Sequence, residues 1–468
     1  MILSEILWML IAIYSIFVLI YFVLINTGYL ILLFLGIQEV LFHNRKPDFD
    51  ICDREGCKLV PGITIIVPAY NEEKIISENV KSLLELDYPK LEVLVVNDGS
   101  SDNTLRKLKS NFKLIEVTRE MEEKIDTEPL KALYNSIKEK RLTVIDKENG
   151  GKADALNAGI NLSRTDLILV IDADTLVERN ALQKLVRRYM STDSRVVALG
   201  GIVRVLNNCE VVSSEVTKAK LPKKFLPGMQ VMEYIRAFLF GRSGWSRINS
   251  LPIISGAFGL FEREGLIDIQ GFRTTTVGED IDAVVRLHKD MRKKDEDYDI
   301  SFLPDPVCWT QVPEKRKILS RQRARWQRGL IETITYNKEM IFNPKYGKVG
   351  VFALPFFLFF ELLGPIIEMT GYFMFIVFFL LGIFSLPYFL LFLAVAVIFG
   401  VLLSLSSLLL AETSLKRYED PIDRLKLLLL AVLENFGYRQ FHTLWRLRGT
   451  IQFLRKETKW GEMSREDI

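Results

Sequence analysis

Cysteine and histidine are scarce in this chain. Its 468 residues contain four Cys and three His, too few for a disulfide framework. Cys52 and Cys57 lie farther apart than the two cysteines of a CxxC metal site and have no histidine companions. We interpret none of the scattered histidines as a metal ligand. The composition therefore favours a reduced, cytosolic setting for the soluble part of the protein.

Net charge and phosphate-binding glycine motifs are also lacking. The formal net charge is +3, so bulk electrostatics do not indicate binding to nucleic acid. Neither GxGxxG nor GxxxxGK[ST] occurs in the sequence. The chain therefore has neither a dinucleotide-binding fingerprint nor a P-loop.

Hydrophobic residues, in contrast, form long runs at both ends. Residues 2–42 carry only two charged side chains, Glu5 and Glu39, over a length well beyond the ~20 residues that cross a bilayer. Basic residues follow at Arg45 and Lys46, so the positive-inside rule places the N-terminus outside and the next domain in the cytosol. The turn-forming residues at 26–28 leave open whether the run crosses once or twice.

A second apolar block covers residues 349–410, with a predicted break at 385–387, and is long enough for two crossings. Glu361 and Glu368 lie inside it on one helical face, unless Pro365 turns the helix. Acidic groups within a bilayer cost a few kcal/mol each. These two therefore either face a cavity or lie at the hydrated interface.

Between about 62 and 320, β-rich runs such as ITIIVPAYN, LEVLVVNDGS and LILVID alternate with helical segments. This alternation predicts an α/β fold with a mainly parallel sheet. Ligands of such sheets bind beyond the carboxyl ends of the strands. The polar strand ends Asn71-Glu72, Asp98-Gly99, Asp172 and Asp174 should therefore meet at one rim. The charged stretch 118–141 fits an exposed helical insertion.

Asp172 and Asp174 end a buried strand as two like charges one residue apart. One interpretation is a strand end that begins a turn. The other is a cation site, because a hard divalent cation binds one or two carboxylates together with substrate phosphates. The acidic VGEDID (277–282) and the basic QRARWQRG (322–329) follow in the sequence and favour a metal–diphosphate site. A bend at the strand end would let both aspartates take part.

The motifs VPAYNE, VVNDGSSDNT, NGGKADALN, IDADT, GED and QRARW occur in this order between about 64 and 329. They resemble those of the inverting family 2 glycosyltransferases with a GT-A fold, in particular the membrane-embedded branch that includes cellulose, hyaluronan and poly-N-acetylglucosamine synthases. Two features depart from that pattern. GED replaces the TED of cellulose synthases, and residues 118–141 lengthen the spacing before NGGKA.

The resemblance implies a set of ligand-binding roles. Nucleotide-sugar binding is implied for Ala69, Tyr70, Glu72, Asp98, Lys152, Asp172, Gln322 and Arg325. Asp174, together with Asp172, is implied to hold Mg²⁺ or Mn²⁺. Helix N-capping is the alternative role for Glu72 and Asp98.

Asp280 is the predicted general base, because inversion requires a carboxylate that takes the proton of the attacking hydroxyl. Glu279 and Asp282 are its rivals within the same motif. The alternative for all three is an acidic helix N-terminus that interacts favourably with the helix dipole.

The QRARW segment is implied to serve both substrates. Arg325, and with it Arg323, can stabilise the leaving diphosphate, and Trp326 can stack on the acceptor sugar. Ser255, Gly256 and Ala257 resemble the family's acceptor-facing segment. The apolar spacing of Trp326, Leu330 and Ile334 would also suit an ordinary amphipathic helix on a membrane surface.

These inferences divide the chain into five segments: an N-terminal transmembrane segment (1–43), a cytosolic GT-A domain (60–320), an amphipathic interfacial helix (321–346), C-terminal transmembrane and interfacial helices (347–447) and a cytosolic tail (448–468). They predict a multi-pass enzyme of the cell membrane with the catalytic domain in the cytosol.

The predicted activity is transfer of a sugar from UDP-GlcNAc or UDP-Glc to a growing β-linked polysaccharide, with export of the product. The implied partners are the nucleotide-sugar donor, a polysaccharide or glycolipid acceptor, the lipid bilayer and accessory export subunits, but not nucleic acid. One alternative is transfer of a single sugar to a polyprenyl-phosphate or glycolipid. Another is a transporter with a regulatory cytosolic domain.

Overall fold

The computed structural model describes residues 2–44, 60–119, 123–213, 215–382, 386–414 and 418–457. The strands are β1 (Ile63–Ala69), β2 (Leu91–Asp98), β3 (Leu114–Glu116), β4 (Leu130–Ser136), β5 (Leu142–Lys147), β6 (Leu167–Val170), β7 (Leu176–Val177), β8 (Arg195–Val205), β9 (Glu210–Val212), β10 (Glu215–Lys218), β11 (Gly259–Glu262) and β12 (Tyr298–Thr310). Arg45, Lys46, Cys52, Cys57 and Ser385, on which some of the predictions rest, lie outside the described residues.

Helices alternate with strands as far as β12, and the described residues after β12 form helices without further strands. In the first two thirds of the chain they are α1 (Ile2–Asn44), α2 (Ile76–Leu84), α3 (Thr104–Phe112), α4 (Lys152–Leu162), α5 (Ala181–Met190), α6 (Phe225–Tyr234), the π-helix η2 (Ile235–Arg242), α7 (Ser243–Arg247), α8 (Arg263–Asp268) and α9 (Glu279–Lys294). After them come α10 (Arg316–Tyr336), η3 (Lys338–Met340), η4 (Pro344–Tyr346), η5 (Val349–Ala353), α11 (Leu354–Phe356), η6 (Phe357–Leu362), α12 (Gly364–Leu380), α13 (Leu386–Leu393), η7 (Ala394–Ile398), α14 (Phe399–Ser414), α15 (Pro421–Leu433), η8 (Glu434–Tyr438) and α16 (Arg439–Leu454).

The described strands form one ten-stranded sheet in the order β3-β4-β5-β2-β1-β6-β11-β8-β12-β7, with β9 and β10 as a separate hairpin. The expected parallel pairing holds for the centre, where β5, β2, β1 and β6 are parallel neighbours. Antiparallel strands flank this centre, because β4 pairs with β5 and β11 with β6 in that sense. The sheet is therefore mixed rather than mainly parallel.

The centre of the sheet is buried on both faces. Ile63, Ile65 and Ile66 of β1 are all 0% exposed, and burying each such side chain contributes roughly 1.5–3 kcal/mol. Helix α4 packs on β1 and β2. It approaches closely because Gly159 has no side chain; a Cβ there would lie 2.6 Å from Ile66.

The expected helical insertion at 118–141 is wrong. Residues Leu130–Ser136 form β4, which pairs with both β3 and β5. Tyr134 and Ser136 are buried on one side of this strand, and the Ser136 hydroxyl donates to Phe112 O at 2.6 Å. The prediction rested on the many charged residues of 118–141 and overlooked the alternating side-chain pattern of LKALYNS (130–136), which is typical of a strand.

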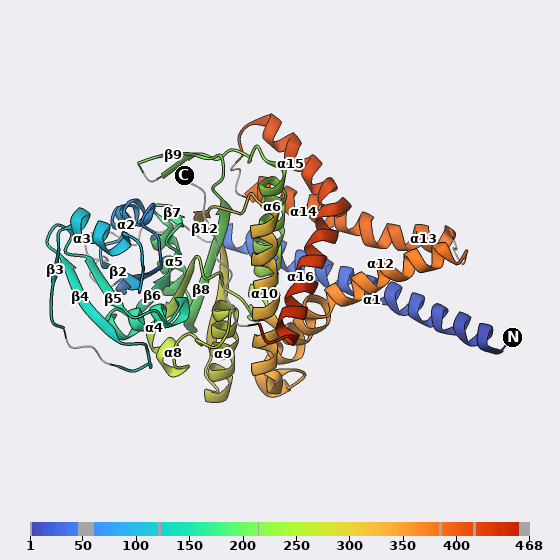
Figure 1. Cartoon of the computed structure of the whole chain (residues 1–468), viewed down its shortest axis with the longest axis horizontal. Helices are drawn as coiled ribbons and strands as arrows, with labels where there is room; N and C mark the ends of the chain where they lie inside the picture. The colour runs from blue at the N-terminus through green and yellow to red at the C-terminus, as the bar shows by residue number, and fades with distance from the viewer. Residues whose placement is uncertain are drawn as a thin grey trace.

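A helical assembly extends from one side of the sheet (Figure 1). In this view α1, α12 and α13 point away from the sheet, while α10 and α16 run side by side next to it. Two helical stretches in the described part of the chain are long and apolar enough to cross a membrane, Trp8–His43 and Val349–Leu380. Asn26 does not break α1, which continues to Asn44, and its amide group donates to Phe22 O within the helix.

Candidate active site

The candidate site begins where β6 ends. The Thr175 N–H donates to the Asp172 carbonyl oxygen across 3.0 Å, and this turn interrupts the alternation of side chains. Asp172 and Asp174 consequently line the same cavity, whose volume is about 840 Å³; a regular strand would have directed them to opposite faces. Among the described residues there is no cluster of three or more metal-ligating side chains. A cation here would therefore take its further ligands from water or phosphate oxygens.

Lys152, the first residue of α4, faces these carboxylates. Its Nζ lies 2.5 Å from Asp172 Oδ1 and 3.5 Å from Glu279 Oε1, and it donates to Gly256 O at 3.3 Å. Burial acts to lower the pKa of Lys152, but Asp172 and Glu279 outweigh it and raise that pKa. Lys152 therefore remains charged and can neutralise a bound diphosphate.

The three acidic residues at the start of α9 occupy different surroundings. Asp280 lines the cavity, and its Oδ2 accepts from the Gly256 N–H at 3.2 Å. Glu279 also lines the cavity but is 6% exposed, and burial raises the pKa of its carboxyl group. Asp282 is fully buried, with Arg286 Nε 2.7 Å away. Asp282 therefore stabilises the interior, and Asp280 is the most accessible carboxylate of the motif.

Asp98 at the end of β2 is 2% exposed and is held by neighbouring groups. Lys147 Nζ lies 3.0 Å from its Oδ1, and the N–H groups of Gly150 and Gly151 donate to its two oxygens at 3.0 and 2.8 Å. The Asn149 side chain adds a fourth donor. These bonds fix the loop that carries Lys152, and they explain why Lys147 can be wholly buried.

Ala69, Tyr70 and Glu72 lie at the end of β1, next to the end of β2. The structure does not bring these three residues or Asp98 into the cavity that holds Asp172. Ala69 is buried and Tyr70 is exposed. The capping positions of α2 and α3 fall at other residues. The helix-capping alternative for Glu72 and Asp98 is therefore wrong.

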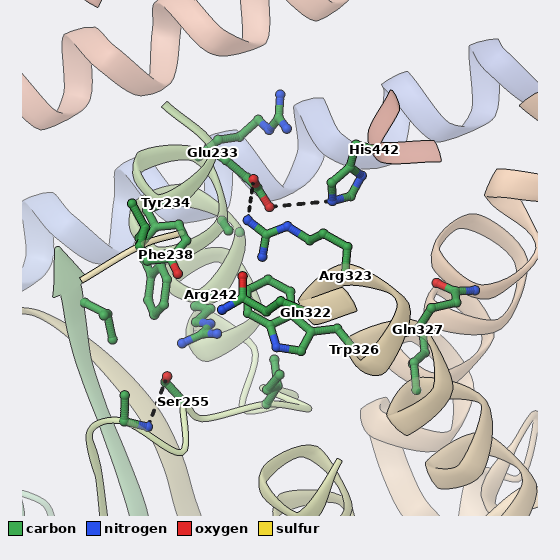
Figure 2. Close-up of a pocket in the computed structure, with 18 of the residues that line it drawn as sticks. Glu233, Tyr234, Phe238, Arg242, Ser255, Gln322, Arg323, Trp326, Gln327 and His442 are labelled. Atoms are coloured by element: carbon green, nitrogen blue, oxygen red, sulfur yellow. Dashed lines mark hydrogen bonds and ion pairs between the residues drawn. The ribbon is translucent and has the colours of Figure 1, made fainter. Parts of the chain in front are cut away.

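Helix α10 presents Gln322, Arg325 and Trp326 to the cavity. Arg323 also lines the cavity and pairs there with Glu233, with 2.8 Å between Nη2 and Oε2. Figure 2 shows this pair on the side of the pocket away from Ser255. The contact between Arg323 and the leaving diphosphate stays a prediction.

The apolar face of α10 is covered by protein. Leu330 and Ile334 are buried and form one cluster with Ile281 and Val285 of α9. A lipid surface is therefore not needed to explain the apolar spacing of this helix. Trp326, by contrast, is 44% exposed.

Ser255, Gly256 and Ala257, between α7 and β11, also line the cavity. A Cβ on Gly256 would lie 3.1 Å from Lys152 Nζ. A side chain at this position would crowd the lysine, so glycine preserves the contact between the two segments.

The cavity continues past Trp326 into the helical assembly. Glu361 accepts from the Tyr29 hydroxyl at 2.6 Å and lies 3.1 Å from Arg446. Glu368 accepts from the Thr443 hydroxyl at 2.7 Å. Both glutamates line the cavity, as the cavity-facing alternative predicts.

Several cavity residues were missed from the sequence. They are Glu233, Tyr234, Phe238, Arg242, His442 and Arg446. The Arg242 guanidinium lies 3.7 Å from the centroid of the Phe238 ring, and burial lowers its pKa to about 10. The available signal was modest: isolated charged residues interrupt the apolar stretch 225–242.

A mixed sheet with carboxylates, a lysine and an arginine gathered at one cavity is the arrangement expected of a glycosyltransferase with a GT-A-like fold. The chain belongs to glycosyltransferase family 2, because the family model described as "Glycosyltransferase like family 2" matches residues 61–329, more than half of its length. A second model, "Chitin synthase", matches residues 277–433.

Curated relatives include two poly-β-1,6-N-acetyl-D-glucosamine synthases. The one from Staphylococcus aureus strain COL is 28% identical over 289 residues, which cover 61% of this chain and 57% of the relative. The one from Staphylococcus epidermidis strain ATCC 35984 is 28% identical over 271 residues, covering 58% and 55%. The chain thus spans little more than half the length of these relatives.

Among solved structures, a mannosyltransferase from Pyrobaculum calidifontis in complex with GDP-Man and Mn²⁺ matches 94% of this chain and 99% of its own. The TM-score is 0.52 and the sequence identity is 18%. This similarity supports the fold.

Proposed function

We propose that this protein is an inverting membrane glycosyltransferase that extends a β-linked polysaccharide from a UDP-sugar, with UDP-GlcNAc and UDP-Glc as the leading donors. The observation that carries the proposal is the single cavity. It is lined by Asp172 and Lys152, the carboxylate of Asp280, the indole of Trp326, and the polar groups around Glu361.

The donor would lie with its diphosphate against Lys152 and Arg325, while Gln322 donates a hydrogen bond. Asp174 and Asp172 would hold Mg²⁺ or Mn²⁺, since two carboxylates in one cavity suit a hard cation that shares phosphate ligands. When bound, the cation would supply positive charge for the leaving diphosphate. The relation of Ala69, Tyr70, Glu72 and Asp98 to the base and ribose is part of the same proposal.

On the acceptor side, Asp280 would take the proton of the attacking hydroxyl. Its carboxylate is held by the Gly256 N–H, so the base is already oriented when the acceptor sugar stacks on Trp326. Ser255, Gly256 and Ala257 would complete the acceptor subsite. The bond formed is between that hydroxyl oxygen and the anomeric carbon, and the bond broken joins this carbon to the diphosphate.

The product would leave through the helical assembly. A sugar chain carries many hydroxyl groups and needs polar partners away from water, and Glu361, Glu368 and Arg446 line the continuation of the cavity. We therefore retain in this proposal the five segments 1–43, 60–320, 321–346, 347–447 and 448–468, the multi-pass topology, the cytosolic site and accessory export subunits. Holding the chain end in place would favour repeated addition.

Transfer of one sugar to a polyprenyl-phosphate or glycolipid is the second candidate, favoured by the apolar cavity residues Phe356, Phe357 and Phe360. The chain belongs to an enzyme family, which argues against the alternative of a transporter with a regulatory cytosolic domain.

The test is a panel of radiolabelled UDP-GlcNAc, UDP-Glc and GDP-mannose offered to purified protein, with measurement of sugar-dependent nucleotide release and product size. We expect long products even with acceptor ends in large excess over donor. Single additions would support the lipid acceptor, and no sugar-dependent nucleotide release would reject both candidates.

A further inference from the structure

Arg323 covers one side of the Trp326 indole. Its guanidinium carbon lies 4.0 Å from the centroid of the ring. Arg323 is 1% exposed, whereas Trp326 is 44% exposed. A buried cation therefore lies against the ring, while a large part of the same ring remains open to the cavity. Figure 2 shows Arg323 between Glu233 and Trp326.

Glu233 holds the guanidinium in this position. Its Oε2 lies 2.8 Å from Arg323 Nη2 and accepts from the Tyr438 hydroxyl at 2.7 Å, and its Oε1 lies 3.6 Å from His442 Nε2. Burial acts to raise the pKa of Glu233, but the Arg323 guanidinium outweighs it and lowers that pKa. The carboxylate is therefore charged, and it links α10 to α6, η8 and α16.

The remaining contacts of Arg323 are few. Its Nε and Nη1 are buried and have no hydrogen-bond partner within the described chain. The carboxylate of Glu233, the Tyr438 hydroxyl and the face of the Trp326 ring are then the groups that compensate a charge removed from water. Because an ion pair of this kind has a defined geometry, it restricts the orientation of the indole.

We propose that Arg323, fixed by Glu233, is a positioning residue that sets the Trp326 indole as a stacking platform for the acceptor sugar. This inference rests on the proposed function. The guanidinium occupies the rear of the ring, so the acceptor takes the open side. An aromatic face suits a hexopyranose whose ring substituents are equatorial, because such a ring presents C–H groups to the negative face of the indole.

The inference assigns Arg323 to the acceptor side of the reaction rather than to the donor diphosphate. Loss of Arg323 should leave donor binding intact, since Lys152, which would hold the diphosphate, is paired with Asp172 and not with Arg323. It should weaken acceptor binding and shorten the product, because a mobile indole holds the chain end less well between additions.

The experiment compares Arg323→Gln, Arg323→Lys and Glu233→Gln in the full-length protein. We expect each to raise the acceptor KM, on the order of tenfold for Arg323→Gln, to shorten the products and to leave UDP affinity unchanged. Arg323→Lys keeps the charge opposite Glu233 and should retain more function than Arg323→Gln. It also serves if Arg323→Gln fails to fold.

Arg316→Gln is the matched control. Arg316 lies on the same helix and stacks on Phe441 at 3.7 Å, but it is exposed and does not line the cavity. Its replacement should leave product length unchanged. A double-mutant cycle with Trp326→Leu provides the specific readout, because Arg323→Gln should cost little once the ring is gone.

Two outcomes would overturn the inference while leaving the proposed function intact. One is a fall in UDP affinity equal to the rise in acceptor KM. The other is an undiminished effect of Arg323→Gln in the Trp326→Leu background. Failure of the wild-type protein to transfer sugar would instead reject the proposed function.

Discussion

The Lys152 ammonium lies 2.5 Å from Asp172 Oδ1, joining the first residue of α4 to the turn after β6. This contact brings together NGGKA and IDADT, two motifs twenty residues apart in the sequence. We expect Lys152→Met to lower UDP affinity by about ten- to a hundredfold, because a charge-assisted hydrogen bond contributes about 1.5–3 kcal/mol. Calorimetric titration with UDP and UMP would measure this. UMP affinity should change less, and an equal loss for both ligands would contradict a role at the diphosphate.

Metal removal should abolish transfer if Asp174 and Asp172 hold a divalent cation. In excess chelator, we expect sugar-dependent UDP release to stop and to return on addition of Mg²⁺ or Mn²⁺. Asp174→Asn should weaken the metal-dependent part of UDP binding while leaving the metal-independent part unchanged. Full activity in chelator would end the metal proposal.

Asp280→Asn is nearly isosteric and should separate chemistry from binding. We expect turnover to fall by at least ~10²-fold, as for a lost general base, while UDP-sugar affinity stays near normal. Asp282→Asn is the matched variant, since Asp282 is buried beside Arg286. It should lower the melting temperature instead. If Asp280→Asn lowers binding and turnover together, Asp280 has a structural role.

Glu361→Gln tests the proposed product path. Glu361 lies 3.1 Å from Arg446 and accepts from the Tyr29 hydroxyl. Loss of its charge leaves Arg446 without this partner and should obstruct passage of the product. In inverted membrane vesicles, we expect nucleotide release to continue while less product becomes protected in the lumen. Unchanged protection would place the path elsewhere.

His288 predicts a pH dependence of stability. Its Nε2 donates to Leu251 O and its Nδ1 accepts from the Tyr298 hydroxyl, and burial lowers its pKa to about 4. In the unfolded state the His288 imidazole has a pKa near 6.5 and binds a proton below that pH, whereas in the folded state it stays neutral down to about pH 4. Stability should therefore fall by up to about 3 kcal/mol as the pH drops from about 6.5 to 4. Melting curves of His288→Gln should show a flatter dependence, and identical slopes would contradict this.

Strand ends were predictable because their chemistry is local. The apolar runs before Ala69, Asp98 and Asp172 required buried strands, and parallel strands bring their carboxyl ends to one edge. The strand β4 was not predictable in this way. Its pattern is short, and its pairing with β3 and β5 depends on partners outside the segment.

The family motifs, their order and the apolar runs at both ends could be predicted from the residues, since each depends on residue type and spacing within a short stretch. Which of the acidic and basic residues meet depends on tertiary packing. In the folded chain Asp280 lines the cavity whereas Asp282 is buried. Arg323 pairs with Glu233, and Glu361 accepts a hydrogen bond from Tyr29, although 332 positions of the chain separate the last two residues. Such pairings depend on how helices pack, and a charged side chain carries no local signal of the partner that will compensate it once both are buried.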